Sequence, residues 1–242
     1  PDEVIVYSAH WDHIGVGGEH AGGEDNIFNG AWDNASGTAG LIEMARAFKA
    51  GPAPKRTVVF LHVTAEEQGL LGSEAYAADP VYPLAKTVGG FNMDSMNVYG
   101  RVTGLGVTGY GQSDFDERLA AAVQPQGRSL VPDYENAAGT YYRSDHFPLA
   151  KRGVPMAYAG SRGDFRDEPI AAREAARSEY GAKRYHQAAD EWSPDWDYSG
   201  MIEDLTVFYD VGRALANGRD WPQWKSGSEF APVRATTASE RR

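Results

Sequence analysis

The chain contains no cysteine. It therefore has no disulfide bond, no thiolate nucleophile and no zinc site built from Cys ligands. Long apolar runs are also missing, because none approaches the roughly 20 residues that a membrane-spanning helix needs. The sequence has no signal peptide at its start. Because it opens with PDEVIVYSA and enters a strand almost immediately, we expect the start to be a processed or trimmed boundary. Any transition metal must be held by His and carboxylate side chains.

Basic residues are scarce relative to acidic ones. The sequence has 23 Lys and Arg against 34 Asp and Glu, which gives a formal net charge of -11. That balance argues against a nucleic-acid backbone or an anionic membrane as the main partner. The sequence also lacks an HExxH zinc helix, a GxSxG nucleophile elbow and a Walker-type phosphate loop. With 42% hydrophobic residues in 242, it can bury the core of one large α/β domain.

The hydrophobic pattern alternates between strand-like and helix-like periods. Strands are expected at residues 4–9, 57–63, 87–93, 102–108 and 154–158. Helices are expected to start near residues 34, 70, 113, 144 and 198. This alternation predicts a three-layer αβα sandwich with a mixed, largely parallel central sheet. Two stretches do not fit: we expect residues 161–184 to form a charged surface excursion or lid, and residues 226–242 a polar, partly disordered tail.

Residue types that bind metals follow the expected strands. They are His10 and Asp12 after the first strand, Asp33 at the next helix start, Glu66 and Glu67 after the second strand, and Asp94 after the third. In open α/β sheets, the carboxyl ends of the strands meet at one edge. Carboxylates gathered there would repel one another unless a cation neutralised them. The sequence therefore predicts a metal site at this edge, although adjacent acidic residues also suit the first turn of a helix.

The ligand types indicate which metal would bind. Imidazole with carboxylates suits zinc, manganese or cobalt, and a bridging carboxylate suits two ions roughly 3.5 to 4 Å apart. Two ions need a further neutral ligand, for which His186 in YHQAADEW is the best candidate. His13 and His146 could contact the metal ligands without binding the metal themselves. His62 is expected to be a residue of the sheet.

Six motifs follow one another along the chain: HWDH, WDNASGTAG, TAEEQGLLGS, FNMDS, YRSDHF and YHQAADEW. In this order they resemble the M28 family of dinuclear zinc peptidases, which includes bacterial aminopeptidases and glutamate-carboxypeptidase-like proteins. The resemblance extends over residues 4–216 and implies a peptidase domain over residues 1–225. Members often have a cis peptide bond after the aspartate of the second motif, so we expect the Asp33–Asn34 bond to be cis.

The resemblance also implies roles for individual residues. One zinc ion would be held by His10, Asp33 and Asp94. The other would be held by Asp33, Glu67 and His186, so that Asp33 bridges the two.

The remaining site residues would work beside the two ions. Asp12 would orient the imidazole of His10. Glu66 would take a proton from the attacking water and pass it to the leaving amine. Tyr141 and Tyr142 are both candidates for holding the oxyanion, and the sequence does not choose between them.

The expected substrate is a peptide, hydrolysed from its N-terminus. A free α-amine suits an acidic site, whereas a carboxypeptidase needs an arginine for the terminal carboxylate, a part that Arg143 could play. The resemblance leaves two further classes open, a one-zinc glutaminyl-cyclase-like aminoacyltransferase and a metal-free binding ectodomain. The HWDHIG-like start also implies an exported protein, periplasmic or extracellular, with an additional protease-associated domain.

Overall fold

The computed structural model describes residues 2–17, 25–132 and 139–241. The strands are β1 (Val4–His10), β2 (Gly15–Val16), β3 (Ile27–Phe28), β4 (Thr57–Val63), β5 (Thr87–Asn92), β6 (Val102–Thr108), β7 (Ser129–Pro132) and β8 (Met156–Phe165). The α-helices are α1 (Gly37–Ala50), α2 (Leu71–Ala78), α3 (Phe115–Val123), α4 (His146–Ala150), α5 (Ile170–Lys183), α6 (Ser199–Asn217) and α7 (Ala231–Thr236).

Six of the strands form the central sheet, in the order β4-β1-β5-β8-β6-β7. β4, β1, β5 and β8 are mutually parallel, and β6 is antiparallel to β8 but parallel to β7. Every residue of β1 is buried, as expected for a strand covered on both faces. The prediction of a mixed, largely parallel sheet is confirmed.

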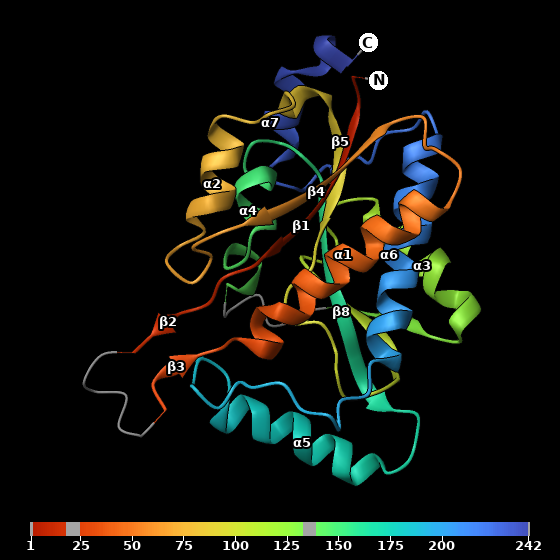
Figure 1. Cartoon of the computed structure of the whole chain (residues 1–242). Coiled ribbons are helices and arrows are strands. Elements are labelled where there is room, and N and C mark those ends of the chain that lie inside the picture. Colours follow the sequence, from red (N-terminus) through yellow and green to blue (C-terminus); the bar gives the residue numbers. More distant parts are fainter. Residues whose placement is uncertain (1, 18–24, 133–138, 242) are drawn as a thin grey trace.

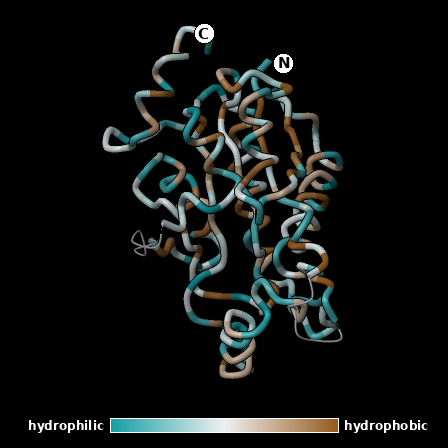
Figure 2. Tube along the Cα trace, turned by 90° about the vertical axis from the view of Figure 1, so that its left-hand side faces the viewer, coloured by the Kyte–Doolittle hydropathy of each residue, from teal (hydrophilic) through white to brown (hydrophobic). Residues whose placement is uncertain are grey.

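Helices cover both faces of this sheet, with α1, α3 and α6 on one side and α2 and α4 on the other (Figure 1). Alternate residues of β1 serve the two layers: Ile5 and Tyr7 belong to the core under α1 and α6, while Val4 and Val6 belong to the core under α2 and α4. Hydrophobic and hydrophilic residues alternate along the helices (Figure 2), and the buried residues of α1, α3 and α6 belong to the core on one face of the sheet.

The expected surface excursion at residues 161–184 is partly wrong. Its first residues continue β8 and pair with β6, with Ser161 opposite Leu105 and Phe165 opposite Val102. The polar Ser161 is tolerated there because its N–H and hydroxyl both donate to Asp204 of α6, at 2.8 and 2.7 Å. The rest of the stretch contains α5, which lies at the bottom of the molecule in Figure 1. Its residues are largely exposed.

The expected tail at residues 226–242 is ordered and packed over residues 226–241, where it forms α7 and a short 3-10 helix. Phe230 is buried against Trp224, at 4.9 Å between ring centroids. The guanidinium of Arg234 is buried as well and donates 2.7 Å to the carbonyl of Thr87 at the start of β5. These few buried groups hold an otherwise polar segment to the domain.

The sheet brings three strand ends to one edge. His10 ends β1 opposite Val63, the last residue of β4, and Asn92 ends β5 opposite Ser8. The segments that follow β1, β4 and β5 therefore leave the sheet side by side. Among the helices of the described ranges, none has the length and apolar character needed to cross a bilayer.

Candidate metal centre

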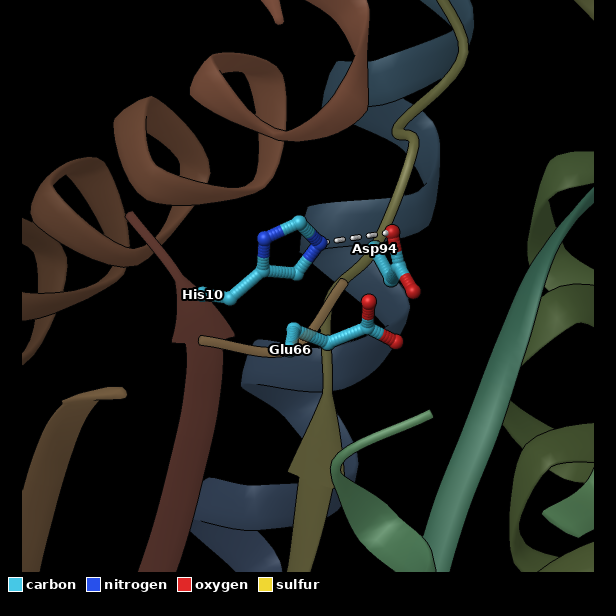
Figure 3. A group of neighbouring side chains, drawn as sticks. All are labelled: His10, Glu66 and Asp94. Atoms are coloured by element: carbon cyan, nitrogen blue, oxygen red, sulfur yellow. Dashed lines mark ion pairs between the residues drawn. The ribbon is translucent and has the colours of Figure 1, made fainter. Parts of the chain in front are cut away.

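The first group of ligand-type side chains surrounds His10. Its Nε2 lies 3.2 Å from Oδ1 of Asp33. The same nitrogen lies 3.4 Å from Oδ1 of Asp94 (Figure 3). The His10 side chain is only 1% exposed, and its Nε2 has no hydrogen-bond partner in the described part of the chain. A buried ring nitrogen that faces two carboxylates without donating to either is suited to share a cation with them.

The second group surrounds Glu67. Nε2 of His186 lies 3.1 Å from Oε2 of Glu67 and 3.4 Å from Oδ2 of Asp33. The His186 ring stacks on Tyr185, with ring centroids 3.8 Å apart, which fixes its orientation. Asp33 therefore presents one oxygen to His10 and the other to His186.

Asp33 is held in place through its backbone, within the irregular turn Ala31–Ser36 that precedes α1. The carboxylate of Asp190 accepts from the N–H groups of Trp32, at 2.9 Å, and Asp33, at 3.1 Å. Tyr180 of α5 donates to the same carboxylate at 3.0 Å. The Asp33–Asn34 peptide bond is cis, as the resemblance implied. Asp190 is buried, and sequence reasoning assigned it no role.

Asp94 is held through its side chain by a row of buried hydrogen bonds. Ser144 donates to Oδ2 of Asp94 at 2.7 Å, and Asn92 donates to Ser144 at 2.7 Å. Ser8 of β1 in turn donates 2.8 Å to Oδ1 of Asn92. The Ser144 hydroxyl accepts from Asn92, so its own proton points to Oδ2 of Asp94. Oδ1 of Asp94 is left facing His10. The sequence signal for Ser144 was its motif, YRSDHF.

Asp12 differs from its expected role. Nδ1 of His10 donates 2.9 Å to the backbone carbonyl of Asp12, and not to its carboxylate. The carboxylate instead accepts the N–H of Ala65 at 2.7 Å. Ala65 lies in the turn after β4 and has a positive φ of 57°. Asp12 thus orients His10 by its backbone and ties β1 to the segment that carries Glu66 and Glu67.

Glu66 stands beside the first group, with a carboxylate oxygen within 4.8 Å of the ligand atoms of His10 and Asp94 (Figure 3). Burial raises the pKa of Glu66 to about 9, and the charge of Asp94 adds to this shift. Both Glu66 and Glu67 line a cavity of about 590 Å³ that opens beside the two groups.

Electrostatics show that the centre favours positive charge. Burial opposes protonation of His10, but the neighbouring carboxylates Asp33 and Asp94 raise its pKa to about 12. Burial also acts against ionisation of Asp33, yet contacts with His10 and His186 keep its pKa well below the ordinary value. A cluster that attracts protons this strongly would also attract a dication, and its imidazole and carboxylate donors suit zinc. The residues present therefore fit the implied metal.

The other candidate histidines and tyrosines lie partly at the candidate metal centre and partly in the core. His13 lies at the second group, with Nδ1 2.8 Å from Oε1 of Glu67. His146 is buried between Tyr141 and Tyr158, and burial lowers its pKa to about 3. Tyr141 is itself buried, whereas Tyr142 lines the cavity and donates 2.7 Å to Glu229.

Comparison with known proteins assigns the family. Residues 1–209 match the family described as Peptidase family M28. The chain belongs to peptidase family M28. Aminopeptidase YwaD of Bacillus subtilis is 29% identical to it over 159 residues, 64% of this chain and 31% of the relative. A probable glutamate carboxypeptidase of Arthroderma benhamiae is 28% identical over 183 residues, 70% of this chain and 23% of the relative.

A solved structure has the same fold as this M28 chain. The structure of BSAP, a zinc aminopeptidase from Bacillus subtilis, aligns with a TM-score of 0.64 at 21% identity, over 95% of this chain and 48% of that one. The expected α/β fold and the expected membership of this metallopeptidase family are confirmed. The chain spans less than half the length of each of these three proteins.

Proposed function

We propose that this M28 chain is a two-zinc exopeptidase that acts as an aminopeptidase. The observation that carries the proposal is the position of Asp33. Its Oδ1 lies 3.2 Å from His10 and its Oδ2 lies 3.4 Å from His186, so one carboxylate serves two histidine-containing groups. A carboxylate placed in this way is suited to bridge a pair of ions.

Each ion would have its own set of ligands. His10 and Asp94 would complete one set around Asp33, and Glu67 with His186 would complete the other. When occupied, the metal centre would lower the pKa of a water molecule and polarise the scissile carbonyl of the peptide.

Glu66 is the residue proposed to move protons. Its carboxylate faces the His10 and Asp94 ligand atoms, borders the cavity and is not required by either ligand set. A carboxylate in that position can accept the proton of the attacking water and deliver it to the leaving amine. Burial and the charge of Asp94 raise the pKa of Glu66, and cations bound beside it would lower that pKa toward the range in which the carboxylate can accept a proton.

The proposed direction of cleavage follows from the charge of the cavity. Asp33, Glu66, Glu67 and Asp94 all line it, and such an arrangement favours a positively charged α-amine. The name of the Bacillus subtilis relative YwaD agrees with this choice.

One observation favours a second candidate, carboxypeptidase or dipeptidase activity. Arg143 also lines the cavity, where its guanidinium could pair with a terminal carboxylate. The name of the Arthroderma relative points in the same direction. A one-zinc cyclase and a metal-free ectodomain are less well supported, because all five proposed ligands are present.

Hydrolysis of a peptide panel tests the proposal. We expect cleavage of aminoacyl-nitroanilides with a free N-terminus, loss of that activity on chelation, and recovery with zinc. Metal analysis of the same protein should give close to two zinc ions per chain. Cleavage of N-blocked but not free peptides would overturn the aminopeptidase assignment, and one zinc per chain at saturation would overturn the two-ion centre.

A further inference from the structure

His13 contacts the second ligand group, although neither ligand set proposed above includes it. Its Nδ1 lies 2.8 Å from Oε1 of Glu67. The side chains of His13 and Glu67 are 3% and 8% exposed, so both are withdrawn from solvent. His13, Glu67 and Asp33 offer ligand atoms that all lie within 4.8 Å of one another.

This contact is not a hydrogen bond. Within the described residues, neither ring nitrogen of His13 has a hydrogen-bond partner, and Oε1 of Glu67 has none either. His10, by contrast, uses its Nδ1 in an ordinary hydrogen bond to a carbonyl. A buried nitrogen lone pair and a carboxylate oxygen in contact without a shared proton repel each other, and a cation between them removes that cost.

The backbone around His13 fixes its ring in this position. Gly30 packs directly against it, and a Cβ added at Gly30 would come within 2.6 Å of the ring carbon Cγ of His13. Gly30 also has a positive φ of 60°, which side chains other than glycine adopt at a cost. His186 stands across Glu67 from His13, with the two rings edge to face and their centroids 5.7 Å apart.

We propose that His13 is a ligand of the second zinc ion, in addition to Asp33, Glu67 and His186. The inference rests on the proposed two-zinc centre. Four protein ligands would close the tetrahedral shell of this ion, as in structural zinc sites.

The two ions would then differ in accessibility. The first ion, with His10, Asp33 and Asp94, keeps an open position. Glu66 stands beside those ligands, so the residue proposed to move protons lies next to the ion that can accept a substrate. The second ion would bind more tightly and mainly orient Asp33.

Substitution His13→Asn tests the proposal, because the asparagine amide can donate a hydrogen bond from about the position of Nδ1 but does not replace an imidazole as a zinc ligand. His62→Asn is the matched control, since His62 is an exposed residue of β4 outside both ligand groups. Zinc retention is measured against a competing chelator for each protein. We expect His13→Asn to release one ion with an affinity reduced at least about tenfold, while His62→Asn and the wild type retain both.

X-ray absorption at the zinc edge of the wild type gives a second readout that does not depend on how the variant folds. We expect imidazole scattering from three histidines, His10, His13 and His186. Scattering from only two of them, or wild-type affinity for both ions in His13→Asn, would overturn the inference. Those results would not affect the proposed function. A wild-type chain without zinc affinity would contradict both the proposed function and the role of His13 as a ligand.

Discussion

At the scale of single residues, the adjacent acids Glu66 and Glu67 have different surroundings. Glu67 faces His13 and His186, and Glu66 faces His10 and Asp94. The side chains of Glu66 and Glu67 point to different groups because the backbone turns after β4, where Ala65 adopts a positive φ. Two consecutive residues can therefore serve one centre in different roles.

Replacement of Glu66 by Gln tests this division. The amide keeps the size of the side chain but cannot accept a proton, so we expect kcat to fall by about 10²- to 10⁴-fold. Zinc content and the unfolding temperature should stay close to those of the wild type, because Glu66 belongs to neither ligand set. Activity assays, metal analysis and thermal unfolding measure the three quantities.

Glu74→Gln is the control for this experiment. Glu74 belongs to α2 and pairs on the surface with Lys151 and Arg152. Its loss should leave kcat unchanged. A Glu66→Gln enzyme that turned over substrate at the wild-type rate would refute the assignment.

At the scale of elements, the sequence predicted those parts whose signal is local. The apolar runs of β1, β4 and β5 and the long periodic helix α6 lie where the pattern placed them. The second half of β8 was missed because its polar Ser161 is satisfied by Asp204, a residue distant in sequence. Asp190 was missed as a support of the centre for a similar reason, since its partners are N–H groups of the backbone 157 and 158 residues earlier.

The C-terminal segment gives the prediction at this scale. Phe230 is 3% exposed and contacts the rings of Tyr141 and Trp224. Phe230→Ala should lower the free energy of unfolding by about 3 to 5 kcal/mol, because it leaves a cavity in this cluster. Urea unfolding of the metal-free protein measures the change.

Val233, on the same helix α7, is the matched control because it is 39% exposed. Val233→Ala should change the free energy of unfolding by less than about 0.5 kcal/mol. If both substitutions had equally small effects, the segment would be a peripheral tail after all.

At the scale of the whole molecule, the candidate metal centre joins parts that are far apart in the sequence. Its candidate ligands come from the ends of β1 and β5, the turn before α1, the turn after β4 and the loop after α5. Ions bound there would connect both halves of the chain. Folding and metal binding should therefore be coupled.

Zinc should accordingly raise the unfolding temperature, and chelation should lower it. At a free zinc concentration of 100 times the Kd, each site adds about 2.7 kcal/mol to the free energy of unfolding. Magnesium at the same concentration should have little effect, because it prefers oxygen ligands to imidazole. Calorimetry with each metal measures the shifts, and equal stabilisation by both would argue against histidine ligation.

The two ends of the described chain lie close together. Asp2 and Arg241 border the same cavity, and Figure 1 places both ends at the top of the molecule. β1 runs from Val4 near this end to His10, and its seven residues span roughly 20 Å at the rise of a β-strand. A reporter protein fused at either end would consequently lie at the opposite end of the sheet from the candidate metal centre, leaving the proposed active site accessible.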